Sequence, residues 1–267
     1  MMTTLDGKVA LITGGTGGTG GIGRGVARRL AAAGATVVLN GRDERKAEPV
    51  LAELDGKGHF AAGDVRSATD MAAVAAGTAE RFGGIDIVVP SAGGNDDEAR
   101  TTAVRGPFAD IDLERVTAFI GAAVAAKLNV VQAAVPYLRA RGGGSVVFVT
   151  SEGGRVPTPG QTAIATFSGG LIMASKVLSK ELARDRIRVN CVCVTVVRDS
   201  PSWTAAFEAE DAVSDRHRKQ YEKIIERSPL GVAAPEDIGD VVAFLASGES
   251  RYLTGLVASP TGGLTVH

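Results

Sequence analysis

The chain has 267 residues, 45% of them apolar, which is typical of a globular protein and excludes a disordered one. Its 29 basic and 30 acidic residues give a net charge of −1, and like charges form no long run, so a nucleic-acid or membrane-surface partner has no support. The two cysteines, Cys191 and Cys193, lie in one apolar run without metal-ligand spacing. We expect two small buried side chains there, because a disulfide between them is geometrically poor.

Two stretches of the sequence bear on where in the cell the protein resides. Residues 1–8 lack a basic stretch followed by an apolar run, so the sequence predicts no signal peptide and a cytoplasmic protein. The weakly charged stretch 118–138 is interrupted by Lys127, and we interpret it as a buried or interface helix, not a membrane span.

Short apolar runs alternate with helical patterns along the whole chain. The runs predict strands at 9–12, 36–39, 59–62, 85–89, 145–150, 187–194 and 256–259. Periodic apolar positions and start signals predict helices at 22–30, 44–54, 68–82, 113–139, 163–182 and 235–245. Because the strands are apolar throughout, we expect one α/β domain over 1–267, with a doubly wound parallel sheet and helices on both faces.

Two segments fit no regular pattern, 93–110 and 197–231. In doubly wound folds, the loops beyond the carboxyl ends of the strands form the ligand crevice. These segments follow predicted strands, so we expect them on the substrate side. The first holds an acidic cluster, 96–98, that either binds a cationic substrate group or is simply solvated.

A glycine-rich turn, 13–25, joins the first strand to the first helix. Glycines in such a turn let backbone N–H groups approach a pyrophosphate, and the helix N-terminus adds a favourable dipole. The turn is the strongest nucleotide-binding signal in the chain.

Several motifs resemble the short-chain dehydrogenase/reductases of the classical type, which have a Rossmann-type fold. They are residues 6–14 (DGKVALITG), 63–65 (GDV), 91–93 (SAG), 187–190 (IRVN), and 254–255 (TG) with 262–263 (GG). The resemblance spans essentially the whole chain. It implies a nicotinamide cofactor, a small-molecule substrate and a homo-oligomer, either dimer or tetramer, built on the helices at 113–139 and 163–182.

The resemblance also implies which residues bind the cofactor. Asp64 and Val65 would line the adenine pocket, and the loop 91–93 would pass beside the cofactor ribose. The full expected set is Gly14, Thr16, Gly17, Gly21, Ile22, Gly23, Arg42, Asp64, Val65, Ser91, Ala92 and Gly93.

The glycine turn departs from the family pattern. Thr16-Gly17 and Gly21-Ile22-Gly23 have the family spacing, yet Thr13-Gly14 ends the strand where the family's Thr-Gly belongs, so the loop is three residues longer than expected. The longer loop either bulges outward and leaves the phosphate-binding turn intact, or itself occupies the pyrophosphate site.

Cofactor preference is predicted from the end of the second strand. Gly41 stands where NAD-binding members usually carry an aspartate for the ribose hydroxyls, and Arg42 could pair with a 2′-phosphate. The sequence therefore favours NADP(H) over NAD(H), with a solvated arginine at a helix start as the alternative reading of Arg42.

The family's catalytic positions are mostly altered. Its members use a serine, a tyrosine, a lysine one turn later and an asparagine. Counting along the motifs places the serine at Ser151, which is retained. The other positions hold Ile164 for tyrosine, Ser168 for lysine, Ala123 for asparagine, and Val194-Thr195 for the proline-glycine pair beside the nicotinamide.

No obvious residue replaces the tyrosine. Lys176 and Lys180 are too far along the helix from Ser168, and Glu152 should point away from Ser151 because neighbouring strand-end residues face opposite sides. His217 and Tyr221 could enter the crevice as a general acid, or be solvated helix residues.

Three functions follow. The first is a divergent NAD(P)-binding oxidoreductase acting on a small carbonyl or alcohol without the usual tyrosine and lysine. The second is a redox-neutral cyclase, dehydratase, isomerase or lyase on the same scaffold. The third is a non-catalytic subunit. The sequence does not name the substrate.

Overall fold

The computed structural model describes residues 4–14, 21–93, 101–207 and 212–266. Its strands form one seven-stranded sheet in the order β3-β2-β1-β4-β5-β6-β7, and every adjacent pair is parallel. The strands are β1 (Val9–Thr13), β2 (Thr36–Gly41), β3 (Gly58–Ala62), β4 (Ile87–Pro90), β5 (Gly144–Ser151), β6 (Ile187–Val194) and β7 (Val257–Ala258). The expected doubly wound parallel sheet is confirmed.

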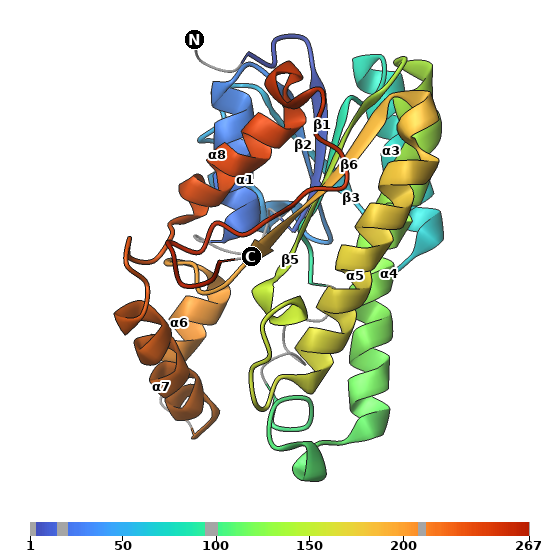
Figure 1. Cartoon of the computed structure of the whole chain (residues 1–267). Coiled ribbons are helices and arrows are strands. Elements are labelled where there is room, and N and C mark those ends of the chain that lie inside the picture. Colours follow the sequence, from blue (N-terminus) through green and yellow to red (C-terminus); the bar gives the residue numbers. More distant parts are fainter. Residues whose placement is uncertain (1–3, 15–20, 94–100, 208–211, 267) are drawn as a thin grey trace.

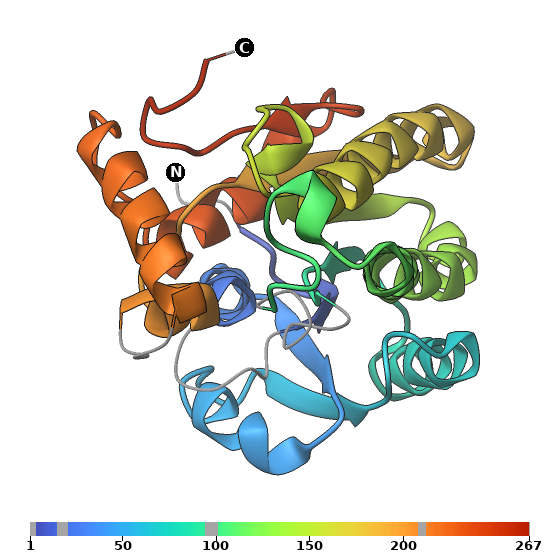
Figure 2. The same cartoon turned by 90° about the horizontal axis from the view of Figure 1, so that it is seen from below.

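Helices cover both faces of the sheet. They are α1 (Ile22–Ala32), α2 (Glu48–Leu51), α3 (Ala68–Phe82), α4 (Leu113–Ala140), α5 (Thr162–Glu181), α6 (Pro201–Phe207), α7 (Ala212–Glu226) and α8 (Pro235–Ala246). Helices α1 and α8 lie on one face, and α3, α4 and α5 form a row on the other (Figures 1 and 2).

The two-sided burial is visible along β5. Val147 and Val149 pack into the apolar layer under α1 and α8, whereas Val146 and Phe148 pack into the layer under α4 and α5. Successive strand residues face opposite sides, so a strand buried on both faces must be apolar at every position.

Side-chain and backbone caps set the helix ends. The side chain of Ser67 accepts from the amide of Asp70 at the start of α3, and the side chain of Asp112 accepts from two amides at the start of α4. Gly83 ends α3 in the left-handed conformation, with φ of 77°. Caps of this kind satisfy the free backbone groups at a helix end.

Two expectations are corrected. The segment 197–231 is not irregular, since it contains α6 and α7, which pack on each other through the rings of Trp203, Phe207 and Tyr221. The expected helix at 44–54 is instead a 3₁₀ turn, Glu44–Lys46, followed by the short α2. Pro49 lacks an N–H and favours the first turn of a helix, so the α-helix begins only at Glu48.

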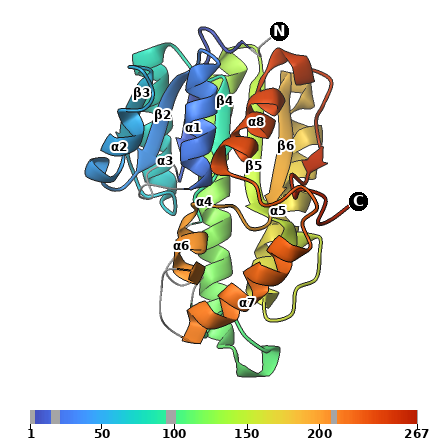
Figure 3. The same ribbon diagram turned by 90° about the vertical axis from the view of Figure 1, so that its left-hand side faces the viewer.

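Helices α6 and α7 follow the carboxyl end of β6 and lie beyond that edge of the sheet (Figures 1 and 3). Helices α4 and α5 are long and apolar enough to match a membrane span by length and composition alone. Both, however, supply residues to the apolar layer against the sheet, which is the expected role of a buried helix.

Candidate functional site

The carboxyl ends of β1 and β4 approach each other closely. The amide of Ser91 donates to Thr13 O at 3.2 Å, and the amide of Ala92 donates to Thr13 Oγ1 at 3.3 Å. Gly14 has a φ of +79°, and a Cβ there would lie 2.6 Å from Ala92 N. The strand order reverses between β1 and β4, and such a switch point is where doubly wound folds bind ligands.

The N-terminus of α1 faces the same edge, because α1 follows β1. Gly21 precedes the helix with a φ of +121°, Ile22 is its first residue, and Gly23 is buried within it. Helix N-termini of this kind favour anions. The expected Thr16 and Gly17 lie outside the described residues, and so does the course of the lengthened loop.

Asp64, beyond the end of β3, is held by Arg66. The guanidinium of Arg66 donates to both carboxylate oxygens, with Nε at 3.0 and 3.1 Å, and the amide of Arg66 donates at 2.9 Å. These bonds, with a smaller contribution from Arg42, lower the pKa of Asp64 to about 2. Two arginines therefore stand beside Asp64, and Arg42 is exposed.

Arg66→Gln is expected to raise the pKa of Asp64 from about 2 toward its ordinary value of 3.8. Because folding depresses this pKa, the ion pair stabilises the protein above pH 3.8, and the stabilisation is lost as the pH falls through about 2. Both side chains are partly exposed, so we expect a loss of only about 0.5 kcal/mol at neutral pH. Carboxyl NMR titration measures the pKa directly, and an unchanged value in the variant would contradict the assignment.

Ser151 lies at the carboxyl end of β5 with two neighbours from the start of α5. A Cβ at Gly153 would lie 3.3 Å from Ser151 Oγ, 3.5 Å from Ile164 Cγ2 and 3.6 Å from Gln161 Oε1. Ser151 Oγ accepts from Gly153 N at 3.1 Å, and within the described ranges its proton has no acceptor. The hydroxyl can thus both cap the turn and donate to a ligand.

Gln161 is a polar neighbour of Ser151 that the sequence reasoning missed. Its side-chain amide makes no hydrogen bond to any described residue, although its backbone is held by the turn before α5. Its position three residues before Ile164 was the available signal, since residues one helical turn apart share a face.

The expected tyrosine and lysine positions are buried in the structure. Ile164 is 6% exposed beside Ser151, and Ser168 is 0% exposed. Ser168 Oγ has no hydrogen-bond partner among the described residues. Ala123 is also buried, on α4, and Val194 pairs with Ser151 in the sheet register.

Two further candidate acids or bases, Glu152 and Tyr221, have described partners. Glu152 is 2% exposed and accepts from Ser259 Oγ at 2.7 Å and Thr265 Oγ1 at 3.1 Å, so its carboxylate lies against the C-terminal segment. The Tyr221 ring contacts the Phe207 ring, with centroids 6.2 Å apart. The His217 side chain and the acidic cluster 96–98 lie outside the described residues.

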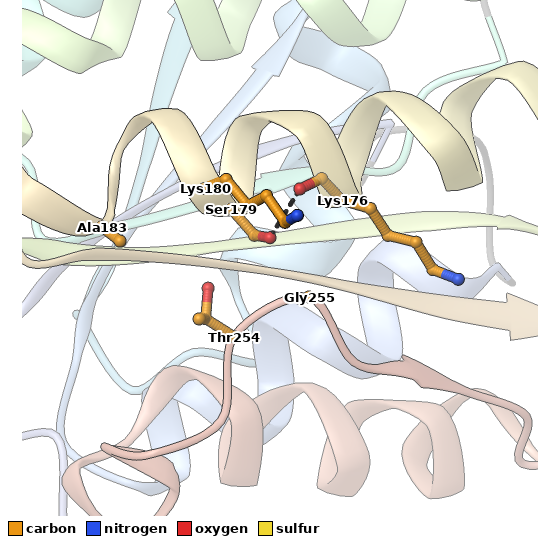
Figure 4. A pocket seen from close by; sticks show the side chains of 6 residues that line it. All are labelled: Lys176, Ser179, Lys180, Ala183, Thr254 and Gly255. Carbon is orange, nitrogen blue, oxygen red and sulfur yellow. Dashed lines mark hydrogen bonds between the residues drawn. The ribbon is translucent and has the colours of Figure 1, made fainter.

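A hollow among the described residues lies at another place (Figure 4). It has a volume of about 550 Å³ and is lined by Lys176, Ser179, Lys180, Ala183, Thr254 and Gly255. The Gly255 amide donates to Val189 O, near the start of β6. Val189 precedes Val194 by five residues, or roughly 16 Å of strand, so the two lysines cannot serve Ser151.

Lys127 is a second residue that the sequence reasoning undervalued. It lies on α4, is only 3% exposed, and donates from Nζ to Pro90 O at 3.2 Å and Ala92 O at 3.0 Å. A charged side chain is rarely this buried unless it is paired. The signal was a single lysine in an otherwise uncharged stretch, 118–138.

Both cysteines are buried, as expected. Their sulfur atoms are 3.9 Å apart, and the Cys191 contact together with burial raises the pKa of Cys193 far above its ordinary value. The thiols therefore behave as small apolar groups. No cluster of metal-ligating side chains is present in the part of the chain that the structure describes.

Comparisons with known proteins agree with this geometry. A family model described as enoyl-(acyl carrier protein) reductase matches residues 15–265. Oxidoreductase UcpA of Escherichia coli strain K12 is 34% identical over 269 residues, covering 99% of this chain and 97% of that protein. Human dehydrogenase/reductase SDR family member 4 is 32% identical over 262 residues, covering 97% and 88%.

Solved structures are similar over the same span. A gluconate 5-dehydrogenase from Burkholderia cenocepacia, in complex with NADP and tartrate, has a TM-score of 0.81 at 28% identity and covers 98% of this chain and 96% of its own. A 3-ketoacyl-(acyl-carrier-protein) reductase from Brucella melitensis, complexed with NADH, has a TM-score of 0.83 at 26% identity and covers 98% and 100%.

Proposed function

The chain belongs to the short-chain dehydrogenase/reductase superfamily as an oxidoreductase of that type, and we propose that it moves hydride between a nicotinamide dinucleotide and a small carbonyl or alcohol without the usual tyrosine and lysine. The observation that carries the proposal is the convergence at one sheet edge. The Gly14–Ala92 approach and the Ser151 hydroxyl lie at the ends of the neighbouring strands β1, β4 and β5.

The described residues fit the adenosine half of such a cofactor. A side chain at Gly14 would overlap the backbone of Ala92, so β1 and β4 can approach this closely only with glycine at 14, and a phosphate would bind beside them at the N-terminus of α1. Asp64 and Val65 lie beyond the end of β3, and Arg42 lies beyond β2, close enough to influence the pKa of Asp64. We propose that Arg42 takes a 2′-phosphate, so that NADP(H) is preferred over NAD(H).

The bound nicotinamide would supply the hydride. Ser151 would donate its hydroxyl proton to the substrate oxygen. Gln161, whose Oε1 lies near Gly153, would accept a hydrogen bond from a donor on the substrate. Ile164 adds an apolar surface close to Gly153, which would exclude water and favour a largely apolar substrate. The proton that completes the reaction would come from solvent, because Ile164 and Ser168 replace the family's acid and its cation.

A second candidate function is a redox-neutral reaction on the same scaffold, such as a dehydration or isomerisation. The burial of Ile164 and Ser168 favours it, because neither side chain can shift the pKa of a proton donor at Ser151. A non-catalytic subunit is the third candidate.

We also propose that the protein is cytoplasmic and forms a homo-oligomer, either a dimer or a tetramer. Met173 and Val177 on α5 expose apolar surface, which favours the oligomer.

Calorimetric titration with NADPH and NADH, followed by NADPH consumption with a panel of small ketones and aldehydes, tests the proposal. We expect NADPH to bind more tightly than NADH and to be consumed with at least one carbonyl. Ser151→Ala is expected to lower kcat/KM about 100-fold, since one hydrogen bond to the reacting oxygen is lost, while NADPH affinity stays unchanged.

The matched control is Thr166→Ala, which removes an exposed hydroxyl from α5, where its one described hydrogen bond is to Thr162 O. It should change neither kcat/KM nor NADPH affinity. Absence of binding by both dinucleotides would refute the proposal and favour the subunit. Tight binding without consumption across the panel would favour the redox-neutral reaction.

A further inference from the structure

Lys127 is buried beneath the edge of the sheet where the cofactor site is proposed. Its ammonium group donates to the carbonyl oxygens of Pro90 and Ala92, which flank Ser91 in the turn after β4. Burying an ammonium group is unfavourable unless its N–H groups are bonded. The cost implies that these two bonds matter to the structure or to its function.

The sheet itself explains why these carbonyls need a partner. The ladder between β4 and β5 contains only two residue pairs, Ile87 with Ser145 and Val88 with Val146, and ends before Pro90. Beyond that point the β5 strand no longer bonds to β4. The carbonyl group of Pro90, in a buried place, and that of Ala92, in a partly buried one, have no partner on β5, and the ammonium of Lys127 bonds to both.

The same turn is held from the opposite side by β1. Thr13 accepts from the amides of Ser91 and Ala92, through its carbonyl oxygen and its hydroxyl respectively. The turn is therefore fixed between β1 and α4. Gly14, whose close approach to Ala92 forms the switch point, depends on that position.

Helix α4 also holds the turn after β3. Asn129 Nδ2 donates to Val65 O at 3.0 Å. Two side chains, two residues apart on α4, thus hold two turns proposed to contact the cofactor. Asn129 holds the turn after β3, proposed for the adenine, and Lys127 holds the turn after β4. Strand β4 is next to β5, which ends in Ser151, so the turn after β4 lies on the proposed nicotinamide side.

We propose that Lys127 is a positioning residue for the dinucleotide, which holds the turn 90–92 in the conformation that accepts the nicotinamide-side ribose. The inference rests on the proposed function and deepens it, because it assigns a specific half of the cofactor to this ammonium group. Substituting a residue with a purely structural role would weaken the binding of both halves of the cofactor equally, or of neither.

Hydrogen exchange in the protein without cofactor tests the hold on the turn. In Lys127→Met, which keeps the length and removes the donors, the amides of Ser91 and Ala92 should exchange about tenfold faster or more, because the turn opens more often. Lys176→Met, which removes an exposed lysine from α5, should leave these rates unchanged. Lys127→Gln keeps a donor and serves if the methionine variant does not fold, with an intermediate rate expected.

Calorimetry with two probes tests the assignment to one half of the cofactor. Lys127→Met should weaken NADPH binding about tenfold, as expected for the loss of hydrogen bonds from a charged donor. Its affinity for adenosine 2′,5′-bisphosphate, which lacks the nicotinamide half, should be unchanged. Asn129→Ala should weaken both ligands, since Asn129 holds the adenine turn.

The outcomes separate this inference from the proposed function. Unchanged exchange at Ser91 and Ala92 in a folded Lys127→Met protein would overturn it, and so would equal losses for NADPH and for the bisphosphate. If the wild-type protein bound no dinucleotide, the proposed function would fail and with it the role of Lys127 toward the cofactor. The exchange rates would still decide whether Lys127 holds the turn.

Discussion

The double substitution Ile164→Tyr with Ser168→Lys is expected to raise kcat/KM for NADPH-dependent carbonyl reduction by about 10²- to 10⁴-fold, the range that a positioned general acid contributes. Ile164 Cγ2 and Ser151 Oγ both lie within 3.5 Å of the Cβ position at Gly153. A tyrosine at 164 would therefore bring its hydroxyl to the same ligand as Ser151.

The lysine is needed as well as the tyrosine. A free tyrosine titrates near a pH of about 10, and a nearby cation lowers that pKa toward neutral. Ser168 Oγ has no hydrogen-bond partner among the described residues, so replacing Ser168 breaks no side-chain hydrogen bond to any of them. It is fully buried, however, and accommodating a lysine should cost about 1–3 kcal/mol of stability.

The matched control is Ile164→Phe with Ser168→Lys, which supplies the ring and the cation without the hydroxyl. It should show no gain in kcat/KM. Stopped assays at several pH values provide the measurement, and only the tyrosine variant should gain a new ionisation in its pH profile. A folded, NADPH-binding tyrosine variant with no gain would show that 164 and 168 are not the superfamily's catalytic positions in this chain.

Gly25→Ala is expected to lower the free energy of unfolding by about 3 kcal/mol, through overpacking between α1 and α8. A Cβ at Gly25 would overlap the carbonyl group of Pro235 at the start of α8. A Cβ at Gly239 would likewise lie 2.6 Å from Gly25 O. The two helices cross backbone to backbone, so neither can yield by rotating a side chain.

For a chain of this length, thermal unfolding should report that loss as a fall in Tm of about 6–12 °C. Gly77→Ala is the control, because it makes the same change inside α3, where a Cβ would meet nothing within 4 Å. It should instead stabilise by about 0.5–1 kcal/mol, since alanine has the higher helix propensity. Equal effects at the two positions would contradict the packing argument.

Local signals accounted for most of the elements. The caps at Ser67 and Asp112 lie one residue before the observed starts of α3 and α4. The predictions for the segments 44–54 and 197–231 were wrong for different reasons. In the first, Pro49 acts on its own local backbone. In the second, the Phe207–Tyr221 ring contact joins α6 to α7, and no local pattern displays a contact between two segments.

The candidate site was predictable only in part. Gly14, Asp64 and Ser151 were expected from motifs that resemble the short-chain dehydrogenase/reductases, and the structure places all three at or just beyond the carboxyl ends of parallel strands. Gln161 and Lys127 were missed, since their importance depends on which backbone groups are left without partners once the strands are paired.

By itself, then, the sequence predicted a doubly wound parallel sheet and the alternation of its strands and helices, because apolar periodicity and glycine turns act within a few residues of the chain. Only the tertiary structure decided that the ammonium of Lys127 holds the turn after β4. The tertiary structure also decided that Arg66 donates hydrogen bonds to the carboxylate of Asp64, and that Ser168 is buried without a described hydrogen-bond partner. Those outcomes depend on burial and on unmet hydrogen bonds, which arise only when distant segments pack together.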